Sequence, residues 1–514
     1  MAFLNFGLVI TSRALGATIS SGGTVKRLFE TSRVFAIIFS FGLFTMSARG
    51  VADPDFWWHL RSGELIVRSH TILRTDPFSF TRFGHPWINH EWLSDVLIFC
   101  LYRVAGFGGL IVSFAAISAA TLLFVYLRSP GRPYFAAVFT VCGAIASTPT
   151  WGVRPQMFTL LFAAIFLVIL DKARSDPKLL WWTVPLTLLW ANLHAGYALG
   201  IALLALSLVG TVLDIALGVE SWARRAAGLR NLGLALVACV AVVAVNPNGM
   251  RLYTYPFETL GSKAMQSYIH EWFSPNFHDP EYAPLLLIIL GILVGFAISP
   301  KRVSPRDLVL LCPATLAGLR SVRHIPVFVL IAVPILTQLW EAWLQSVGAT
   351  IRTNRGSVHR LSEKRLLNAV ILGTFAAFSI VRVALVIHRQ PQTEAQHFPA
   401  GATAFISTQR PPAPVLNHYN WGGYFIWKLY PDYRVFIDGR ADLYGDSFMN
   451  EFAASYYLAG DWRKSLRTWG IRTIVLPPDA PLVTALQSQP GWRRTYADSQ
   501  AVVLIQTSSS SRSD

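Results

Sequence analysis

The strongest constraint on the fold is a series of apolar runs that recur along the chain, with short basic segments between them. We predict membrane-spanning helices near residues 34–50, 108–127, 134–151, 156–171, 179–191, 196–217, 229–246, 284–299, 306–319, 325–343 and 366–387. Only 14% of the residues are charged, whereas a soluble domain carries roughly a quarter. The sequence therefore predicts a polytopic α-helical membrane protein with about eleven spans.

The basic segments predict the orientation of these spans, because Lys and Arg accumulate in cytoplasmic loops. When Lys26, Arg27 and Arg33 are placed in the cytoplasm, every later inside loop is basic. These loops carry Arg128 and Arg132; Lys172, Arg174 and Lys178; Arg224, Arg225 and Arg230; Lys301, Arg302 and Arg306; and Arg352, Arg355, Arg360, Lys364 and Arg365. The net charge of +16 thus follows from topology, and we expect no nucleic-acid partner. We expect a cytoplasmic N-terminus and an extracytoplasmic tail.

Two large segments fall outside in this orientation. One is the loop 51–107, in which Leu60–Val67 and Trp92–Val104 have the amphipathic pattern of interfacial helices. The other is the tail 388–507, which we predict to be a small α/β domain with strands at 434–437, 473–476 and 501–505 and a helix over 448–469. The predicted units are therefore a membrane unit 1–387, an extracytoplasmic domain 388–507 and a disordered end 508–514.

The first candidate for chemistry is Asp53-Pro54-Asp55-Phe56-Trp57-Trp58-His59, directly after the first span. Pro54 interrupts the helix, so these side chains are expected to project from a loop. A carboxylate at the rim of a low-dielectric region could act as a general base with a raised pKa. Asp55 and His59 could also hold a divalent cation such as Mg²⁺ or Mn²⁺. The alternative is a helix stop followed by a belt of aromatic residues.

The second candidate, later in the same loop, is His90-Glu91 with Asp95. Glu91 and Asp95 would share one face of a helix. The His-Glu-Trp order recurs at 270–272, which slightly favours function. The alternative is a helix N-terminus at which the dipole favours Glu91.

The third candidate is a set of cationic residues at the outer ends of the spans: Arg154, His194, Arg320, Arg323 and His324. Their outside position runs against the general trend of the basic residues, and arginine forks suit phosphate oxygens. The alternative is that they reach lipid phosphates at the membrane surface.

The fourth candidate lies in the tail, in the segments 417–424 and 438–442. Aromatic rings beside amides and carboxylates are typical of sugar-binding surfaces. Asp-Gly after a strand is equally an ordinary turn. The residues that we expect to bind an acceptor here and nearby are His194, His270, Glu271, Trp421, Asp438 and Arg440.

At this point the residues carry a resemblance. A first span, a long outer loop that opens with Asp-Pro-Asp, many further spans and an outer C-terminal α/β domain resemble the GT-C superfamily, whose polytopic glycosyltransferases use polyprenyl-phosphate-linked sugars. The segments 53–63, 89–93 and 435–445 are similar to a bacterial glycosyltransferase-like branch. The resemblance implies that Asp53 or Asp55 is the catalytic base or a metal ligand, and that basic residues grip the donor phosphate, for which Arg320 and Arg323 fit by position.

The sequence leaves three functions open. The first is an inverting glycosyltransferase of the bacterial cytoplasmic membrane, with a polyprenyl-phosphate-linked sugar as donor and its acceptor undefined. Its catalytic residues would be Asp53, Asp55, His59, His90 and Glu91, with Arg154, Arg320, Arg323 and His324 on the donor phosphate. The second is a transporter or flippase of a lipid-linked or anionic substrate, for which Pro-interrupted spans would provide a midplane site. The third is a non-catalytic protein that binds sugars at the outer face.

Overall fold

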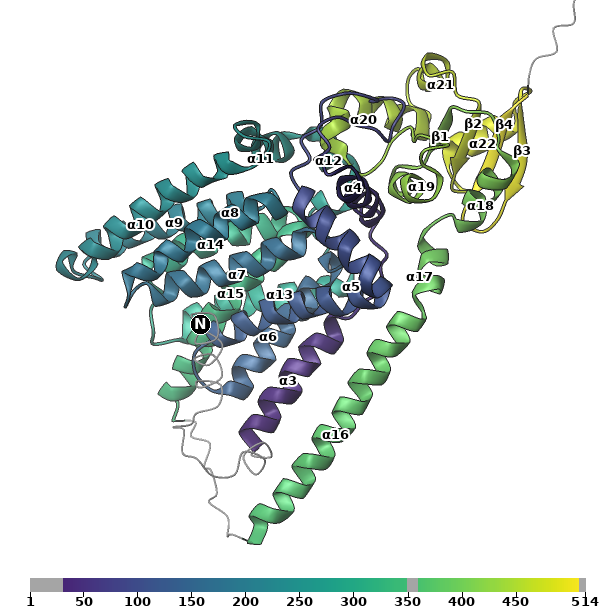
Figure 1. Cartoon of the computed structure of the whole chain (residues 1–514). Helices are drawn as coiled ribbons and strands as arrows, with labels where there is room; N and C mark the ends of the chain where they lie inside the picture. Colours follow the sequence, from purple (N-terminus) through teal and green to yellow (C-terminus); the bar gives the residue numbers. More distant parts are fainter. Residues whose placement is uncertain (1–30, 349–358, 508–514) are drawn as a thin grey trace, which may run out of the picture.

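The computed structural model describes residues 31–348 and 359–507, and in that part all eleven expected apolar runs lie on helices (Figure 1). The helices that carry these runs are α3 (Thr31–Ser47), α5 (Trp92–Arg128), α6 (Pro133–Ser147), α7 (Gln156–Lys172), α8 (Thr183–Leu193), α9 (Tyr197–Ala216), α10 (Trp222–Val242), α13 (Ala283–Ile298), α14 (Pro305–Arg320), α15 (Ile325–Ser346) and α16 (His359–His388). The expected residues Lys26 and Arg27 and the end 508–514 lie outside the described ranges.

Six segments of the described chain are long and apolar enough to cross a membrane, and the chain is a multi-pass membrane protein. They are Trp92–Arg128, Tyr197–Ala216, Trp222–Val245, Pro280–Ile298, Val322–Ser346 and Arg365–His388. The other five expected spans lie on helices of 11 to 17 residues, which is shorter than the ~20 residues that a full crossing needs. The total of eleven spans stays a prediction.

Burial separates the centre of the bundle from its edge. In α15, 78% of the apolar window is buried, and its residues pack with α7, α8, α9 and α14 in one core. In α16 the corresponding share is 11%, and the helix runs along one side of the bundle to the tail (Figure 1). The apolar window of α16 is more apolar than that of α15 and yet little buried, so its outer face is suited to lipid.

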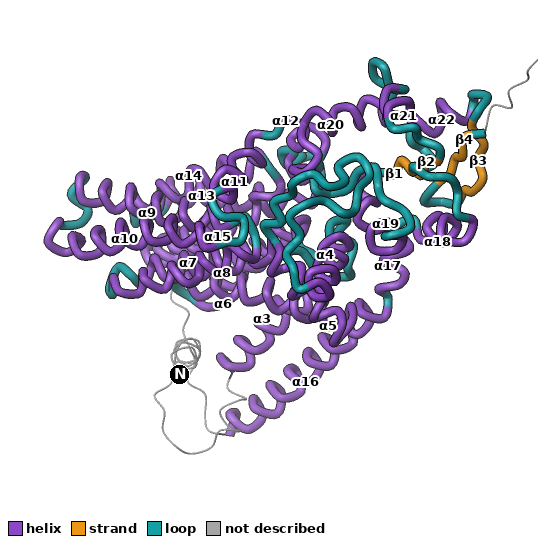
Figure 2. The backbone as a smooth tube through the Cα atoms, turned by 45° about the horizontal axis from the view of Figure 1, so that its top comes forward, coloured by secondary structure: helices purple, strands orange, loops and turns teal. Residues whose placement is uncertain are grey.

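The outer loop contains both expected amphipathic helices. Leu60–Val67 lies within α4 (Phe56–Ser69), and Trp92–Val104 forms the first part of α5, which bends at Gly106 with φ 58°. The two helices pack closely at Gly63, where a Cβ atom would lie 2.1 Å from the Asp95 carbonyl oxygen. The two helices lie beside the bundle, and residues 70–91 between them are turns and irregular backbone, part of the teal stretch in Figure 2.

The tail is an α/β unit around a four-stranded sheet with the order β1-β2-β4-β3, in which β1 and β2 are parallel and the other pairs antiparallel. Its elements are α17 (Gln390–His397), α18 (Ala400–Gln409), β1 (Val415–Asn417), α19 (Gly422–Leu429), α20 (Ala441–Tyr457), α21 (Lys464–Thr468), β2 (Thr473–Leu476), α22 (Pro481–Gln487), β3 (Trp492–Ala497) and β4 (Val502–Gln506). The expected strands at 473–476 and 501–505 are confirmed as β2 and β4.

Two details of the predicted tail are wrong. Arg434–Ile437 is not a strand of the sheet, because Val435 instead forms an isolated parallel bridge with Ser79 of the outer loop. The expected helix 448–469 is two helices, because α20 ends where Leu458 and Gly460 adopt positive φ. The pairing of Val435 with Ser79 joins the tail to the outer loop.

The tail docks on α4 through aromatic rings. The Trp57 ring lies 5.0 Å from Tyr424 and 5.3 Å from Phe398, centroid to centroid, and both contacts are edge-on. Phe56 and Trp57 are fully buried in a core that also contains residues of α18 and α19. The hydrophobic core thus runs continuously from the outer loop into the tail, which positions the tail over the start of α4.

Candidate functional site

The polar residues separate by end of the bundle, as the orientation predicts. At one end the expected inside loops meet: Arg128 and Arg306 both pair with Asp171, at 2.8 and 3.6 Å, and Arg174 and Arg225 both pair with Glu220. The expected outside residues gather at the other end, beside α4 and the tail. These expected inside residues therefore meet at one end of the bundle, and the orientation in the membrane stays a prediction.

Asp53 and Asp55 lie in the turn between α3 and α4. The Asp55 N–H donates to Asp53 Oδ1 at 2.8 Å, and Trp58 Nε1 donates to Asp55 Oδ1 at 3.2 Å. The Gln390 side chain holds the preceding backbone, since it accepts from the Val51 N–H at 2.7 Å and donates to the Val51 carbonyl at 3.0 Å. The expectation that His59 projects from a loop is wrong: α4 begins at Phe56, directly after Pro54.

Arg154 joins this turn to a distant segment. Its Nε lies 3.2 Å from Asp53 Oδ2, and both of its terminal nitrogens donate to the carboxylate of Glu271. Arg323 approaches the same carboxylate at 4.0 Å. We call Asp53, Asp55, Arg154, Glu271 and Arg323 the rim cluster; four of its members were predicted as catalytic or phosphate-binding residues and Glu271 as an acceptor contact.

Asp55 is the unusual acid of the rim cluster. Burial raises its pKa to about 7, and the negative charge of Asp53 adds to the rise, while Arg154 and His59 oppose it. Burial also raises the pKa of Glu271, but the two arginines lower it further, so that the net shift is downward. A carboxyl that titrates near neutral pH beside the carboxylate of Asp53 is suited to take up a proton.

A second group, the imidazole cluster, surrounds Glu91. Its carboxylate lies 3.5 Å from His59 Nε2, 3.5 Å from His90 Nε2 and 3.2 Å from His194 Nε2. His59 Nδ1 is 2.7 Å from Asp95 Oδ1. Burial opposes ionisation of Glu91, but the histidines hold its pKa far below the usual range. Glu91, His59 and His90 were predicted as catalytic residues and His194 as an acceptor contact. Glu91 and Asp95 were expected to share one face of a helix, and His59 contacts both of them.

His194 has a defined tautomer in this cluster. Its Nδ1 accepts from the Gly196 N–H at 2.9 Å and lies 2.8 Å from the Thr159 hydroxyl. Since Nδ1 is an acceptor, the proton is on Nε2, which faces Glu91. Burial lowers the pKa of His194 to about 3, and the charges of Arg323 and Arg154 oppose the attraction of Glu91. His194 is therefore a neutral donor to Glu91.

The tail reaches the rim cluster through Gly439 and Tyr419, which lie in the candidate segments 438–442 and 417–424, and a residue outside the tail, Tyr255, reaches the imidazole cluster. A Cβ atom on Gly439 would lie 1.6 Å from Asp55 Oδ1, so only glycine leaves room for this carboxyl. The Tyr419 hydroxyl donates to the Gly439 carbonyl at 3.2 Å, and the Tyr255 ring of α11 (Arg251–Gly261) lies 4.1 Å from that of His90. Gly439 was visible only as part of an ordinary Asp-Gly turn.

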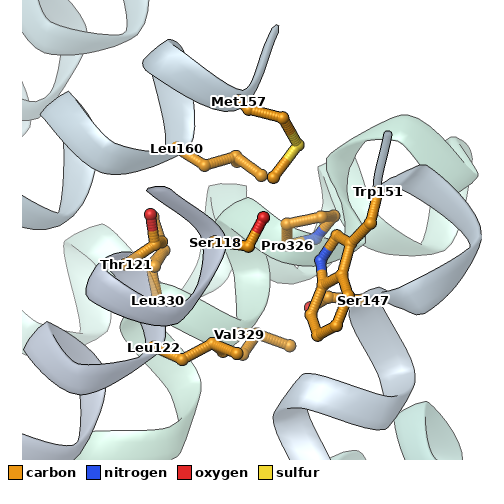
Figure 3. A pocket seen from close by; sticks show the side chains of 10 residues that line it. All are labelled: Ser118, Thr121, Leu122, Ser147, Trp151, Met157, Leu160, Pro326, Val329 and Leu330. Atoms are coloured by element: carbon orange, nitrogen blue, oxygen red, sulfur yellow. The ribbon is translucent and has the colours of Figure 1, made fainter. Parts of the chain in front are cut away.

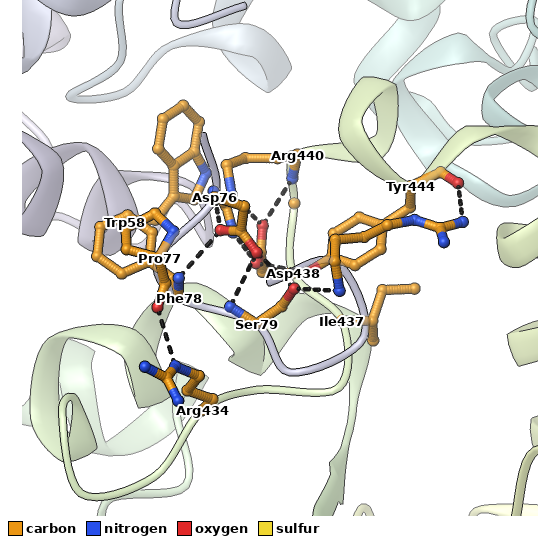
Figure 4. Close-up of polar contacts among 12 residues, drawn as sticks. Trp58, Asp76, Pro77, Phe78, Ser79, Arg434, Ile437, Asp438, Arg440 and Tyr444 are labelled. Atoms are coloured by element: carbon orange, nitrogen blue, oxygen red, sulfur yellow. Dashed lines mark hydrogen bonds and ion pairs between the residues drawn. The ribbon is translucent and has the colours of Figure 1, made fainter. Parts of the chain in front are cut away.

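Asp438 and Arg440, on either side of Gly439, lie in a buried group that we call the knot, with Asp76 and Tyr444 (Figure 4). Arg440 pairs with Asp76 at 2.8 Å and with Asp438 at 2.7 Å, and the Tyr444 hydroxyl donates to Asp438 at 2.7 Å. The side chains of Asp76, Asp438 and Arg440 are at most 1% exposed. In this placement they hold the Gly439 turn, and acceptor binding by Asp438 and Arg440 stays a prediction.

The remaining predicted residues lie around the rim cluster. The His324 ring is half-buried, 6.1 Å from Trp272, whereas His270 and Arg320 are exposed. Within the described residues, the Arg320 side chain has no hydrogen bond or ion pair. Trp421 is buried in the tail, with its ring 5.1 Å from that of His418. The structure thus brings the acids and most cations together and leaves Arg320, His270 and Trp421 outside the clusters.

Two hollows lie within the membrane unit. An apolar groove of about 370 Å³ between α13, α14 and α15 includes Leu316, Leu319 and Phe328, and so ends beside Arg320. A cavity of about 10 Å³ lies among α5, α6, α7 and α15 (Figure 3), at the lower limit for one water molecule. The hydroxyls of Ser118 and Ser147 in its wall donate to carbonyls of their own helices, so this cavity is a packing gap.

The guanidinium group of Arg154 lies close to the predicted metal site. Among residues 31–348 and 359–507, no group of three or more His, Cys, Asp or Glu side chains is arranged to hold a metal ion. The charge of Asp53 is instead balanced by the guanidinium of Arg154. A divalent cation on Asp55 and His59 stays a prediction.

Comparisons with known proteins give matches among solved structures. No family model and no curated protein matches the chain. The chain is similar to the archaeal oligosaccharyltransferase AglB from Archaeoglobus fulgidus in complex with an inhibitory peptide and a dolichol-phosphate, with a TM-score of 0.49 and 10% identity over 86% of this chain and 69% of that chain. It is also similar to ArnT from Cupriavidus metallidurans bound to undecaprenyl phosphate, with a TM-score of 0.45 and 15% identity over 93% of this chain and 98% of that chain.

With TM-scores of 0.49 and 0.45 and 10% to 15% identity, these matches carry no argument about what the chain does. Unrelated activities share a fold, so the function has to be argued from the residues of the site.

Proposed function

We propose that this chain is a membrane glycosyltransferase that moves a sugar from a polyprenyl-phosphate-linked donor to an acceptor hydroxyl at the outer face of the cytoplasmic membrane. The observation that carries the proposal is Asp55, a carboxyl with a pKa of about 7. It lies beside Arg154 and beneath the tail. The tail approaches Asp55 so closely at Gly439 that a Cβ atom there would overlap with the carboxyl group. Acid, arginine and binding domain thus meet at one rim.

The reaction follows from these positions. Asp55 takes the proton of the acceptor hydroxyl, whose oxygen attacks the anomeric carbon while the bond from that carbon to the phosphate oxygen breaks with inversion. Arg154 and Arg323 stabilise the negative charge that grows on the departing phosphate. The imidazole cluster fixes the face of α4 that carries His59, and so orients the turn of Asp53 and Asp55.

The apolar groove supports the lipid part of the donor. It runs along α14 towards Arg320, and its wall residues Leu316 and Leu319 point no polar group into it. An isoprenoid chain in this groove would place its phosphate near Arg320 and near Arg323 of the η6 turn (Val322–His324). The hydrophobic effect, at roughly 25 cal/mol per Å² of apolar area, would then hold the chain while charge holds the phosphate.

The test is transfer of a radiolabelled sugar from an undecaprenyl-phosphate-linked donor by the purified full chain. Asp55→Asn is expected to abolish transfer, and Asp53→Asn to reduce it, while both variants keep the wild-type elution volume in detergent. Full transfer by both variants would show that the assignment is wrong. Sugar that crosses a liposome membrane without a new glycosidic bond would instead identify a transporter.

A further inference from the structure

Glu271 occupies the place between Arg154 and Arg323 in which a phosphate would bind. Arg154 donates to both carboxylate oxygens of Glu271, and Arg323 Nη1 lies 4.0 Å from Glu271 Oε2. A guanidinium presents the same fork to a carboxylate and to a phosphate. The side chain of Glu271 thus fills the oxyanion seat that the proposed function needs.

The charges show why the two anions exclude one another. The carboxylates of Asp53 and Glu271 face the guanidinium groups of Arg154 and Arg323, and Asp55 adds negative charge when it is ionised. A phosphate ester that entered without displacing Glu271 would add negative charge next to these carboxylates, and uncompensated charge in a half-buried place is costly. When Glu271 leaves, the phosphate takes its place beside the arginines.

Glu271 is placed so that its side chain can leave while the backbone stays. It lies in η4 (His270–Trp272), a single turn with no buried residue. The anchors of this turn are backbone contacts: Ser321 Oγ donates to the Glu271 carbonyl at 2.8 Å, and the Val322 N–H donates to the Phe273 carbonyl at 3.0 Å. The exposed fraction of the side chain also rises along the cluster, from 10% at Asp53 to 27% at Glu271, so Glu271 lies at the more solvent-exposed end.

We propose that the Glu271 carboxylate is a built-in stand-in for the phosphate of the substrate, which closes the arginine seat until a phosphate ester displaces it. The ligand class is a phosphate mono- or diester. The inference rests on the proposed function only for the source of that ester, because the seat itself is defined by the four charged side chains.

The first test removes the stand-in. Glu271→Gln is titrated with farnesyl phosphate in detergent, and its affinity is expected to rise by about tenfold, within the usual range of coupling between two ligands of one protein. Glu258→Gln is the control, because it makes the same change of charge on an exposed residue of α11. An unchanged or weaker affinity of Glu271→Gln would overturn the proposal.

A second titration uses inorganic phosphate in place of farnesyl phosphate. An equal gain for both ligands shows that the seat reads the phosphate group alone. A gain restricted to farnesyl phosphate shows that the ester is lipid-linked and that the apolar groove takes part in binding.

The third measurement needs no substitution and so is independent of how the variants fold. Carbodiimide labelling of Glu271 in the wild-type protein is followed by mass spectrometry, with and without farnesyl phosphate. Displacement frees the carboxylate, so labelling of Glu271 should accelerate while that of Glu258 stays constant. Labelling of Glu271 that slows or stays constant while farnesyl phosphate binds contradicts displacement.

The outcomes separate this inference from the proposed function. If Asp55→Asn transfers sugar at the wild-type rate while Glu271→Gln still binds farnesyl phosphate more tightly, the function fails and the stand-in holds. If Asp55→Asn is inactive and Glu271→Gln shows no gain in affinity, the function holds and the stand-in fails.

Discussion

The rim cluster and the knot both pair carboxylates with arginines, but they differ in how closely these side chains meet and how deeply they are buried. In the knot, Arg440 meets Asp76 and Asp438 at 2.7 to 2.8 Å, and these side chains are at most 1% exposed. In the rim cluster, Glu271 is 27% exposed and Arg323 only approaches it. The knot is therefore closed to solvent, whereas the rim cluster is exposed to solvent at Glu271.

This difference decides what each group can do. A buried arginine whose neighbours satisfy it keeps its charge and fixes the chain around it. Burial lowers the pKa of Arg440, but Asp438 and Asp76 raise it well above its usual value. Asp55 has no such balance, and its pKa rises to about 7. The close, buried contacts of Arg440 therefore indicate a structural role for the knot. The raised pKa of Asp55 indicates a catalytic role for the rim cluster.

The largest expected effect on stability comes from the knot. Arg440→Met should destabilise the folded protein by about 3–5 kcal/mol, because it leaves two buried carboxylates without a partner. The control is Arg434→Met, since Arg434 is exposed and donates to a single backbone carbonyl of the outer loop. Thermal unfolding in detergent measures both, and a melting temperature of Arg440→Met equal to that of the control would refute the scaffold role.

The second prediction concerns the contact between the tail and Asp55. Gly439→Ala adds a Cβ atom that would lie 1.6 Å from Asp55 Oδ1, so Asp55 must move. A displacement of about 1 Å costs roughly 100-fold in rate. We expect kcat to fall by about that factor, with a smaller change in KM. Gly261→Ala is the matched variant, because nothing lies within 4 Å of a Cβ atom there. Equal kcat values in the two variants would exclude Gly439 from the site.

The third prediction is a pair of opposite responses to pH. Transfer needs ionised Asp55, so kcat/KM should rise with pH and level off above about 7. The folded state binds this proton more tightly than the unfolded chain, whose Asp titrates near 3.8. The stabilising contribution of Asp55 is therefore complete below about pH 4 and is lost as the pH rises to about 7.

The variant Asp55→Asn separates the two responses. It should be inactive at every pH, and above pH 7 it should unfold at a higher temperature than the wild type, because no charge is buried. Rate profiles and unfolding temperatures between pH 5 and pH 9 are the measurements. A wild-type rate that does not depend on pH over this range would contradict a base of this pKa.

Comparison of the two groups also shows what the sequence can predict. Asp53, Asp55 and Glu91 were found because acids next to a span are costly, and Arg323 because it breaks the charge rule for outer loops. Asp438 and Arg440 look equally functional in the sequence. Their burial depends on Asp76, more than 350 residues away, and no local pattern indicates that contact.

The fold was predictable to the same extent and for the same reason. Apolar length identified the helices, and short strand-like apolar runs identified β2 and β4, since both signals are local. Arg434–Ile437 has an equally good strand pattern, but its partner is Ser79 of the outer loop. Gly439 was missed because its requirement comes from Asp55, which approaches it from a different segment.

The smallest expected effect is that of the substitution Arg320→Gln on KM, which tests how far the rim cluster extends along the surface. Arg320 is exposed at the end of α14, next to the groove and to Arg323, and no described residue pairs with it. An exposed charge interacts with a phosphate by about 0.2–1 kcal/mol, so Arg320→Gln should raise KM for the lipid donor by at most about fivefold and leave kcat unchanged. The increase should disappear in high salt, since an exposed interaction is screened. A loss of kcat of about tenfold or more in Arg320→Gln would show that Arg320 acts on the reacting phosphate and belongs to the rim cluster.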